Sequence, residues 1–178
     1  MRFSRELLST IGLLLLVAHG VARADDACAG FAWDVAHERS VFATAPSAQQ
    51  AGHDVDSAPL VTTDRLYDLA LSPQEQVTLA ASPGKKALTD GAYAGLVRIK
   101  VASAGTYRVS LSRPFWVDVV KGGALIASTN FTGRPGCDAP HKLVQYPLPA
   151  GELLLQVSGA TDDRVKIAVT AARATTAH

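Results

Sequence analysis

The sequence predicts an all-β protein with one sandwich domain, and three observations lead to this prediction. From Leu60 onward, apolar and polar residues alternate with a period of two, which is typical of strands with one buried face. Turn-forming residues recur about every 8–12 positions, as they do in β-sandwiches. The 154 residues that follow a predicted leader of 24 are the length of a single domain.

The first 24 residues have the pattern of a secretory signal peptide. Arg2 and Arg5 give a positive start, Ile11 to Val17 form a short apolar run, and Ala22-Arg23-Ala24 offers small residues for cleavage after Ala24. The apolar run is shorter than the roughly 20 residues of a membrane-spanning helix. We therefore expect export to the bacterial periplasm or beyond the cell, with no stable membrane insertion after cleavage.

The charge of the expected mature chain excludes some partners. Removing Arg2, Arg5, Arg23 and Glu6 leaves 14 basic and 15 acidic residues, a net charge of −1 with neutral histidines. No basic field is present, so we expect no nucleic-acid partner.

Two cysteines remain, Cys28 and Cys137. In an oxidising compartment the expected arrangement is a disulfide, which would tie the N-terminal segment to a distant loop. The alternative is a free thiol or a thiolate metal ligand, because Cys137 and His141 are spaced closely enough to share one ion.

The N-terminal segment, residues 25–59, is expected to be held by this disulfide. Its stretch from Phe31 to Phe42 fits a short helix, with Trp33, His37 and Val41 on one face, although Phe31 to Val35 also alternates like a strand. Pro46 to Pro59 is rich in small and polar residues and predicts an exposed loop.

The sandwich is expected over residues 60–172 with about nine short strands, followed by a frayed tail at 173–178. Ser72-Pro73-Gln74-Glu75 resembles a capping box, and predicts a single helical turn. Asn130 to Lys142 predicts an irregular loop, and Pro147 is expected to close a strand. The clearest strands are 65–71, 96–101, 106–111, 115–120, 125–128, 141–146, 153–158 and 164–171.

Part of this pattern resembles a known family. Ala104-Gly105-Thr106-Tyr107 leads into Trp116-Val117-Asp118, and Leu148-Pro149-Ala150-Gly151 leads into Leu153 to Gly159. This order resembles the bacterial pre-peptidase C-terminal (PPC) domain. The resemblance implies a jelly-roll-like antiparallel β-sandwich without catalytic activity, associated with binding of polymers or carbohydrates.

The whole chain also resembles short exported bacterial proteins that carry the name homogentisate 1,2-dioxygenase. That activity needs ferrous iron on two histidines and a carboxylate. The expected mature chain has no close His-x-His pair followed by glutamate, so the ligand pattern does not support the name.

Several residues are candidate ligands of a divalent metal ion, which is the alternative to a protein without a cofactor. His53, Asp54 and Asp56 lie within four positions and offer nitrogen and oxygen donors; a solvated loop is the favoured explanation of the three. His37 and His141 are the other histidine candidates.

Trp116 and Asp118 are the candidate ligand-binding residues, because they share one face of a strand. An aromatic ring beside a carboxylate can stack on a sugar and accept its hydroxyls; burial of Trp116 in a second core layer is the alternative. Trp33 is expected to join this patch when the disulfide docks its segment.

No Gly-x-Ser-x-Gly elbow and no phosphate-cradling glycine loop is present in the sequence. The sequence therefore favours an exported, non-catalytic β-sandwich that binds a carbohydrate, a polymer or an envelope protein. A small metal-dependent protein or enzyme is the alternative.

Overall fold

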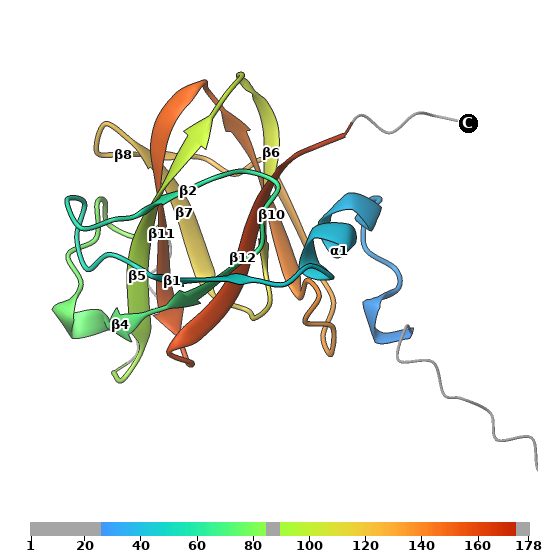
Figure 1. The fold of residues 1–178 in the computed structure, drawn as a ribbon, viewed down its shortest axis with the longest axis horizontal. Coiled ribbons are helices and arrows are strands. Elements are labelled where there is room, and N and C mark those ends of the chain that lie inside the picture. The colour runs from blue at the N-terminus through green and yellow to red at the C-terminus, as the bar shows by residue number, and fades with distance from the viewer. Residues whose placement is uncertain (1–25, 85–89, 174–178) are drawn as a thin grey trace, which may run out of the picture.

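The computed structural model describes residues 26–84 and 90–173. The predicted signal peptide, Lys85-Lys86 and most of the tail at 173–178 lie outside the described residues. Within them the chain forms two β-sheets packed face to face, with one α-helix outside the sandwich (Figure 1). The prediction of an all-β sandwich is confirmed.

The first sheet has six strands in the order β1-β3-β12-β6-β10-β9. Their bounds are β1 Ser47–Gln50, β3 Tyr67–Ala70, β12 Arg164–Ala171, β6 Gly105–Leu111, β10 Lys142–Leu148 and β9 Asn130–Gly133.

The second sheet has the order β2-β5-β11-β7-β8, and β4 also pairs with β5. Their bounds are β2 Leu60–Val61, β4 Ser72–Pro73, β5 Tyr93–Val101, β11 Gly151–Ala160, β7 Trp116–Lys121 and β8 Ala124–Ile126.

The connections have jelly-roll topology. From β3 to β12 the chain passes back and forth between the sheets, so that β3, β6, β10 and β12 lie in one sheet and β5, β7, β8 and β11 in the other. The pairs among these eight strands are antiparallel, as expected. The added edge strands differ, because β1 and β2 pair in parallel with β3 and β5.

Two predictions about loops are wrong. The stretch from Pro46 to Pro59 contains β1, and Ala51 and Ala58 are buried. Asn130 to Lys142 contains β9, which pairs with β10. Both segments are too polar to show an apolar alternation. They become strands by pairing with neighbours that do alternate, β1 with β3 and β9 with β10.

Two strand and turn details also differ. Pro147 lies inside β10, opposite Thr106, where β9 no longer pairs with β10 and a missing N–H costs little. The expected helical turn is a 3₁₀ turn at Gln74–Gln76, but no side chain caps it, so the capping box is wrong.

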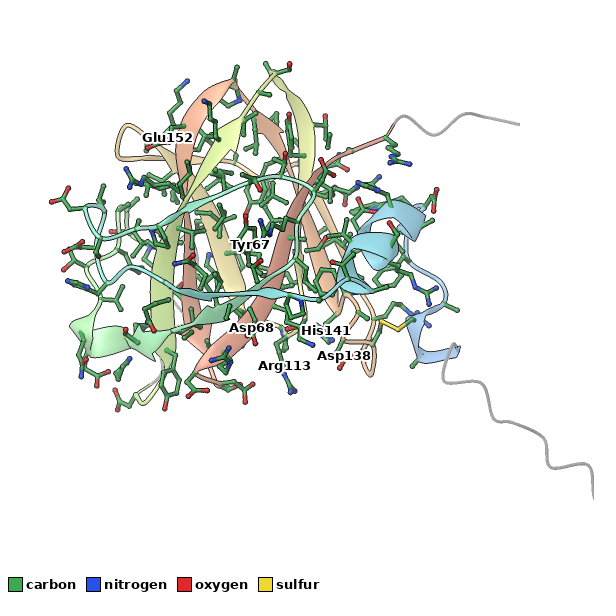
Figure 2. The ribbon with its side chains drawn as sticks, in the orientation of Figure 1. Tyr67, Asp68, Arg113, Asp138, His141 and Glu152 are labelled. Carbon is green, nitrogen blue, oxygen red and sulfur yellow. A yellow bond between two sulfur atoms is a disulfide. The ribbon has the colours of Figure 1, made fainter. Side chains whose placement is uncertain are left out.

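Alternating strand residues fill the space between the sheets (Figure 2). Leu155, Val109 and Val119 on central strands are fully buried there. Figure 2 also places His141 and Glu152 toward opposite ends of the sandwich.

The helix α1, Ala36–Phe42, confirms the helical interpretation of the N-terminal segment. Its Val41 and Phe42 pack with Leu66 and Ala168 on the outer face of the first sheet. A 3₁₀ turn at Asp26–Cys28 precedes the helix.

Candidate functional site

A cleft of about 700 Å³ opens at the edge of the sandwich between β7–β8 of one sheet and β9–β10 of the other. This volume lies within the range of ligand pockets, about 300–1,000 Å³. Its lining is mainly apolar and aromatic: Pro114, Phe115, Trp116, Val117, Leu125, Ile126, Phe131, Val144 and Tyr146, with Gly84, Asp118, Ala127, Ser128, Lys142 and Gly159.

The cleft exists because β8 is shorter than β7. Ile126 is the last residue of β8 that pairs with β7, opposite Val119. The chain then crosses to the other sheet, where the Thr129 amide donates to the Gln145 carbonyl. In the part of the chain that the structure describes, Trp116 to Asp118 therefore has no strand partner on this side.

This edge of β7 joins two surfaces that a neighbouring strand would separate. Val117 points into the core with Phe115 and Val119, whereas Trp116 and Asp118 face the outside of the second sheet. We call the surface around Trp116, Asp118, Gly84 and Leu125 the outer part of the cleft. The surface formed by Phe115, Val117, Val144 and Tyr146 is the inner part.

Asp118 holds the outer part together. One oxygen, Oδ2, accepts hydrogen bonds from Trp116 Nε1 at 3.0 Å, the Gly84 amide at 3.3 Å and Gln156 Nε2 at 3.4 Å. The carboxylate is buried, with Asp118 only 7% exposed. Asp118 therefore orients the Trp116 indole. The sequence analysis expected its carboxylate to accept the hydroxyls of a sugar, but Oδ2 is already engaged by these three donors.

Gln156 on β11 fastens the loop that buries Asp118. Its amide donates to the Ala81 carbonyl at 3.0 Å and accepts from the Ala81 amide at 3.2 Å. This two-way bond lays residues 81–84 across the outer face of the second sheet. The loop approaches Asp118 closely at Gly84, where a Cβ would lie 3.1 Å from Asp118 Oδ1 and the carboxylate would have to shift slightly to admit it.

Tyr146 forms one wall of the inner part of the cleft. Its buried hydroxyl donates to the Val117 carbonyl at 2.7 Å, so a side chain of one sheet bonds the exposed backbone edge of the other. Burial raises the pKa of the Tyr146 phenol above its ordinary value, and the nearby Asp118 carboxylate adds to the shift.

The rim of the cleft carries an ammonium group and two rings. Lys142 Nζ lies 5.4 Å from the centre of the Trp116 ring and donates to the Phe115 carbonyl at 3.2 Å, a cation–π geometry. Phe131 on β9 is 70% exposed, which is unusual for a phenylalanine.

Trp33 does not line this cleft, so its expected place beside Trp116 is wrong. Its ring lies 5.2 Å from the Arg108 guanidinium on the outer face of the first sheet. Arg108 Nη1 also donates to the Asp34 carbonyl and to the buried Glu38 carboxylate. The disulfide therefore docks Trp33 against β6 and α1, away from β7.

The histidine candidates lie apart from one another. His37 Nε2 is 2.7 Å from Asp64 Oδ1, and His53 Nδ1 is 3.3 Å from Ser57 Oγ. Asp54 accepts from the Ser57 amide and hydroxyl, and these bonds lower its pKa. Among residues 26–84 and 90–173, no three histidine, cysteine or acidic side chains gather as a metal site, Asp56 included.

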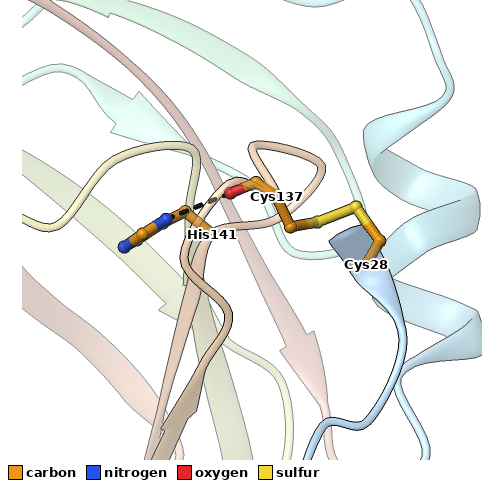
Figure 3. The surroundings of a disulfide bond; sticks show 3 residues. All are labelled: Cys28, Cys137 and His141. Carbon is orange, nitrogen blue, oxygen red and sulfur yellow. Dashed lines mark hydrogen bonds between the residues drawn. A yellow bond between two sulfur atoms is a disulfide. The ribbon is translucent and has the colours of Figure 1, made fainter. Parts of the chain in front are cut away.

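Cys28 and Cys137 form the predicted disulfide across 109 positions (Figure 3). The alternative of a Cys137–His141 metal pair is wrong, because the Cys137 sulfur is bonded to Cys28. His141 Nδ1 instead lies 3.1 Å from the Cys137 carbonyl oxygen, which steadies the loop that carries the bridge.

The sequence missed the half of the cleft that the first sheet supplies. Phe131, Lys142, Val144 and Tyr146 belong to β9 and β10, and only long-range pairing brings them to β7. Phe131 did carry a signal, because it is a single aromatic residue within an otherwise polar, turn-rich stretch.

Comparison of the chain with protein-family models and with curated proteins gives no match. Over the described residues, no helix has the length and apolar character needed to cross a membrane.

Proposed function

We propose that the protein is an exported, non-catalytic binding module that takes a carbohydrate in the cleft between β7–β8 and β9–β10. The observation that carries the proposal is the pair of aromatic side chains, Trp116 and Phe131, at the opening of a pocket-sized cleft. Aromatic rings favour sugar rings because both present flat apolar faces.

The polar groups around the rings fit such a ligand. The Lys142 ammonium is a hydrogen-bond donor for sugar oxygens, and Asp118 fixes the orientation of Trp116 before a ligand arrives. A preorganised ring loses little conformational freedom on binding. The resemblance to PPC domains, which are associated with polymer and carbohydrate binding, agrees with this proposal.

The export part of the proposal rests on the leader-like N-terminus and on the Cys28–Cys137 bridge. Disulfides persist in oxidising compartments. An envelope glycan or an extracellular polysaccharide would be the carbohydrate met there.

A glycan array followed by calorimetry on the mature protein tests the proposal. Trp116→Ala and Phe131→Ala should each weaken the saccharide hits about tenfold, the effect of losing about 1.4 kcal/mol of contact. Leu60→Ala is the matched control, because Leu60 is an exposed apolar residue outside the cleft. Absence of any saccharide hit, or full affinity in both aromatic variants, would overturn the proposal.

A further inference from the structure

The cleft has two chemically different parts, and this difference says more about its ligand. The outer part holds the indole of Trp116 and the Asp118 carboxylate, with the Lys142 ammonium beside the ring. The inner part is formed by the side chains of Phe115, Val117, Val144 and Tyr146, each of them 7% exposed or less. A ligand that fills the cleft therefore meets the Trp116 indole and the Lys142 ammonium at one end and a nearly dry apolar wall at the other.

The side chains of the inner part offer no free hydrogen-bond donor to a polar ligand, and the Tyr146 oxygen is their only acceptor. The Tyr146 hydroxyl is engaged by the Val117 carbonyl at 2.7 Å, and the other three side chains are hydrocarbon. Sugar hydroxyls placed there would lose most of their bonds to water without replacement, which is unfavourable. An aliphatic group placed there would gain from leaving water.

The two parts are continuous around the edge of β7. β8 ends its pairing at Ile126, so no strand of the described residues covers this edge of β7 beside Val117, where the cleft lies. The cleft lining includes residues of both faces, Trp116 and Val117 among them. One molecule can thus contact both parts if a polar head continues into a slender apolar chain.

We propose that the ligand is an amphiphilic glycan, a saccharide that carries an alkyl or acyl chain. The saccharide lies against Trp116 and Phe131, and the chain enters the inner part between Val117 and Val144. This inference rests on the proposed function and adds an alkyl or acyl chain to the proposed saccharide ligand.

Alkyl β-glucosides and alkyl β-maltosides with hexyl, heptyl and octyl chains, all below their micelle concentrations, test the inference by calorimetry. If the chain is buried, each added methylene should tighten binding about fourfold. Glucose and maltose supply the value without a chain, and octanol supplies the value without a saccharide.

Two variants test the outer and inner parts of the cleft separately. Trp116→Ala should weaken every glycoside by a similar factor and keep the dependence on chain length. Val144→Phe fills the inner part, so it should flatten the chain-length dependence. Leu60→Ala, outside the cleft, is the control that should leave both the sugar affinity and the chain-length dependence unchanged. If Val144→Phe fails to fold, NMR contacts between the octyl chain and the methyl groups of Val117 and Val144 in the unaltered protein give the same information.

The outcomes distinguish the inference from the function on which it rests. Saccharide binding that is independent of alkyl-chain length would overturn the inference that an alkyl or acyl chain is buried, and would leave the carbohydrate proposal in place. Octanol binding as tightly as octyl glucoside would show that the saccharide is not recognised, and would overturn the proposed function. No binding of any compound would overturn both.

Discussion

At the scale of single residues, the cleft depends on side chains that bond to the backbone or side chain of a different segment. Asp118 joins Trp116 to the loop at Gly84, Gln156 joins β11 to Ala81, and Tyr146 joins β10 to β7. All three are buried, and a buried polar group that loses its partner costs about 1–3 kcal/mol. Their bonds therefore define the shape of the cleft more sharply than its apolar lining does.

Tyr146 should make the protein sensitive to alkaline pH. Burial raises the pKa of its phenol in the folded protein, whereas the unfolded chain releases this proton near pH 10. The stability from this group is fully present below about pH 10 and is lost as the pH rises toward the folded pKa, because the unfolded state binds fewer protons. Urea unfolding between about pH 9 and 11 measures the loss.

Tyr146→Phe should remove this part of the alkaline loss and should cost about 1 kcal/mol at neutral pH, since the Val117 carbonyl loses its donor. Tyr93→Phe is the matched control, because Tyr93 is only partly buried on the margin of the core. An unchanged pH dependence in Tyr146→Phe would show that Tyr146 ionises no differently in the folded and unfolded chains.

At the scale of elements, strands with a strong apolar alternation were predictable from the sequence. Arg164–Ala171 has the predicted bounds, because Val165, Ile167 and Val169 all face the core. β1 was missed because Ser47 to Gln50 has no apolar alternation and becomes a strand only by pairing with β3. The site divides in the same way: Trp116 and Asp118 share a strand and were found together, whereas Tyr146 and Phe131 reach the cleft through distant pairing.

The attachment of α1 combines a small apolar contact with a buried ion pair. Val41 and Phe42 supply the apolar part. Glu38, 1% exposed, accepts from Arg108 Nη1 at 3.1 Å and from Thr170 Oγ1 at 3.1 Å. Glu38 Oε2 and Arg108 Nε are buried without a hydrogen-bond partner in the described chain, so desolvation offsets much of the pair's attraction.

Glu38→Ala should therefore destabilise the protein strongly, by about 3–5 kcal/mol, because it leaves the Arg108 charge buried and unpaired. The double variant Glu38→Leu with Arg108→Leu should be closer to the unaltered protein, since no charge is left behind. Urea unfolding of the two single variants and the double variant measures this difference. Equal or greater loss in the double variant would show that the ion pair itself is a large net source of stability.

At the scale of the whole molecule, the sandwich and the N-terminal segment are held by different forces. The core cluster between the sheets includes no residue before Ala51. Residues 26–35 contact the sandwich through the disulfide, through the Trp33 ring against Arg108, and through polar bonds such as the Ala32 amide to Thr132 Oγ1 and Arg108 to the Asp34 carbonyl. The covalent bridge thus holds a segment that contributes no residue to the core cluster between the sheets.

Reduction of the bridge should release this segment and leave the sandwich folded. In hydrogen exchange, amides of residues 26–35 should lose protection, while those of β6 and β11 keep it. Cys28→Ser with Cys137→Ser should lower the free energy of unfolding by roughly 4–5 kcal/mol in the chain-entropy model for so long a loop. Because the core cluster lies entirely outside the segment, the variant should still unfold in one cooperative transition. Loss of exchange protection in β6 and β11 would instead mean that the two sheets depend on the N-terminal segment for their packing.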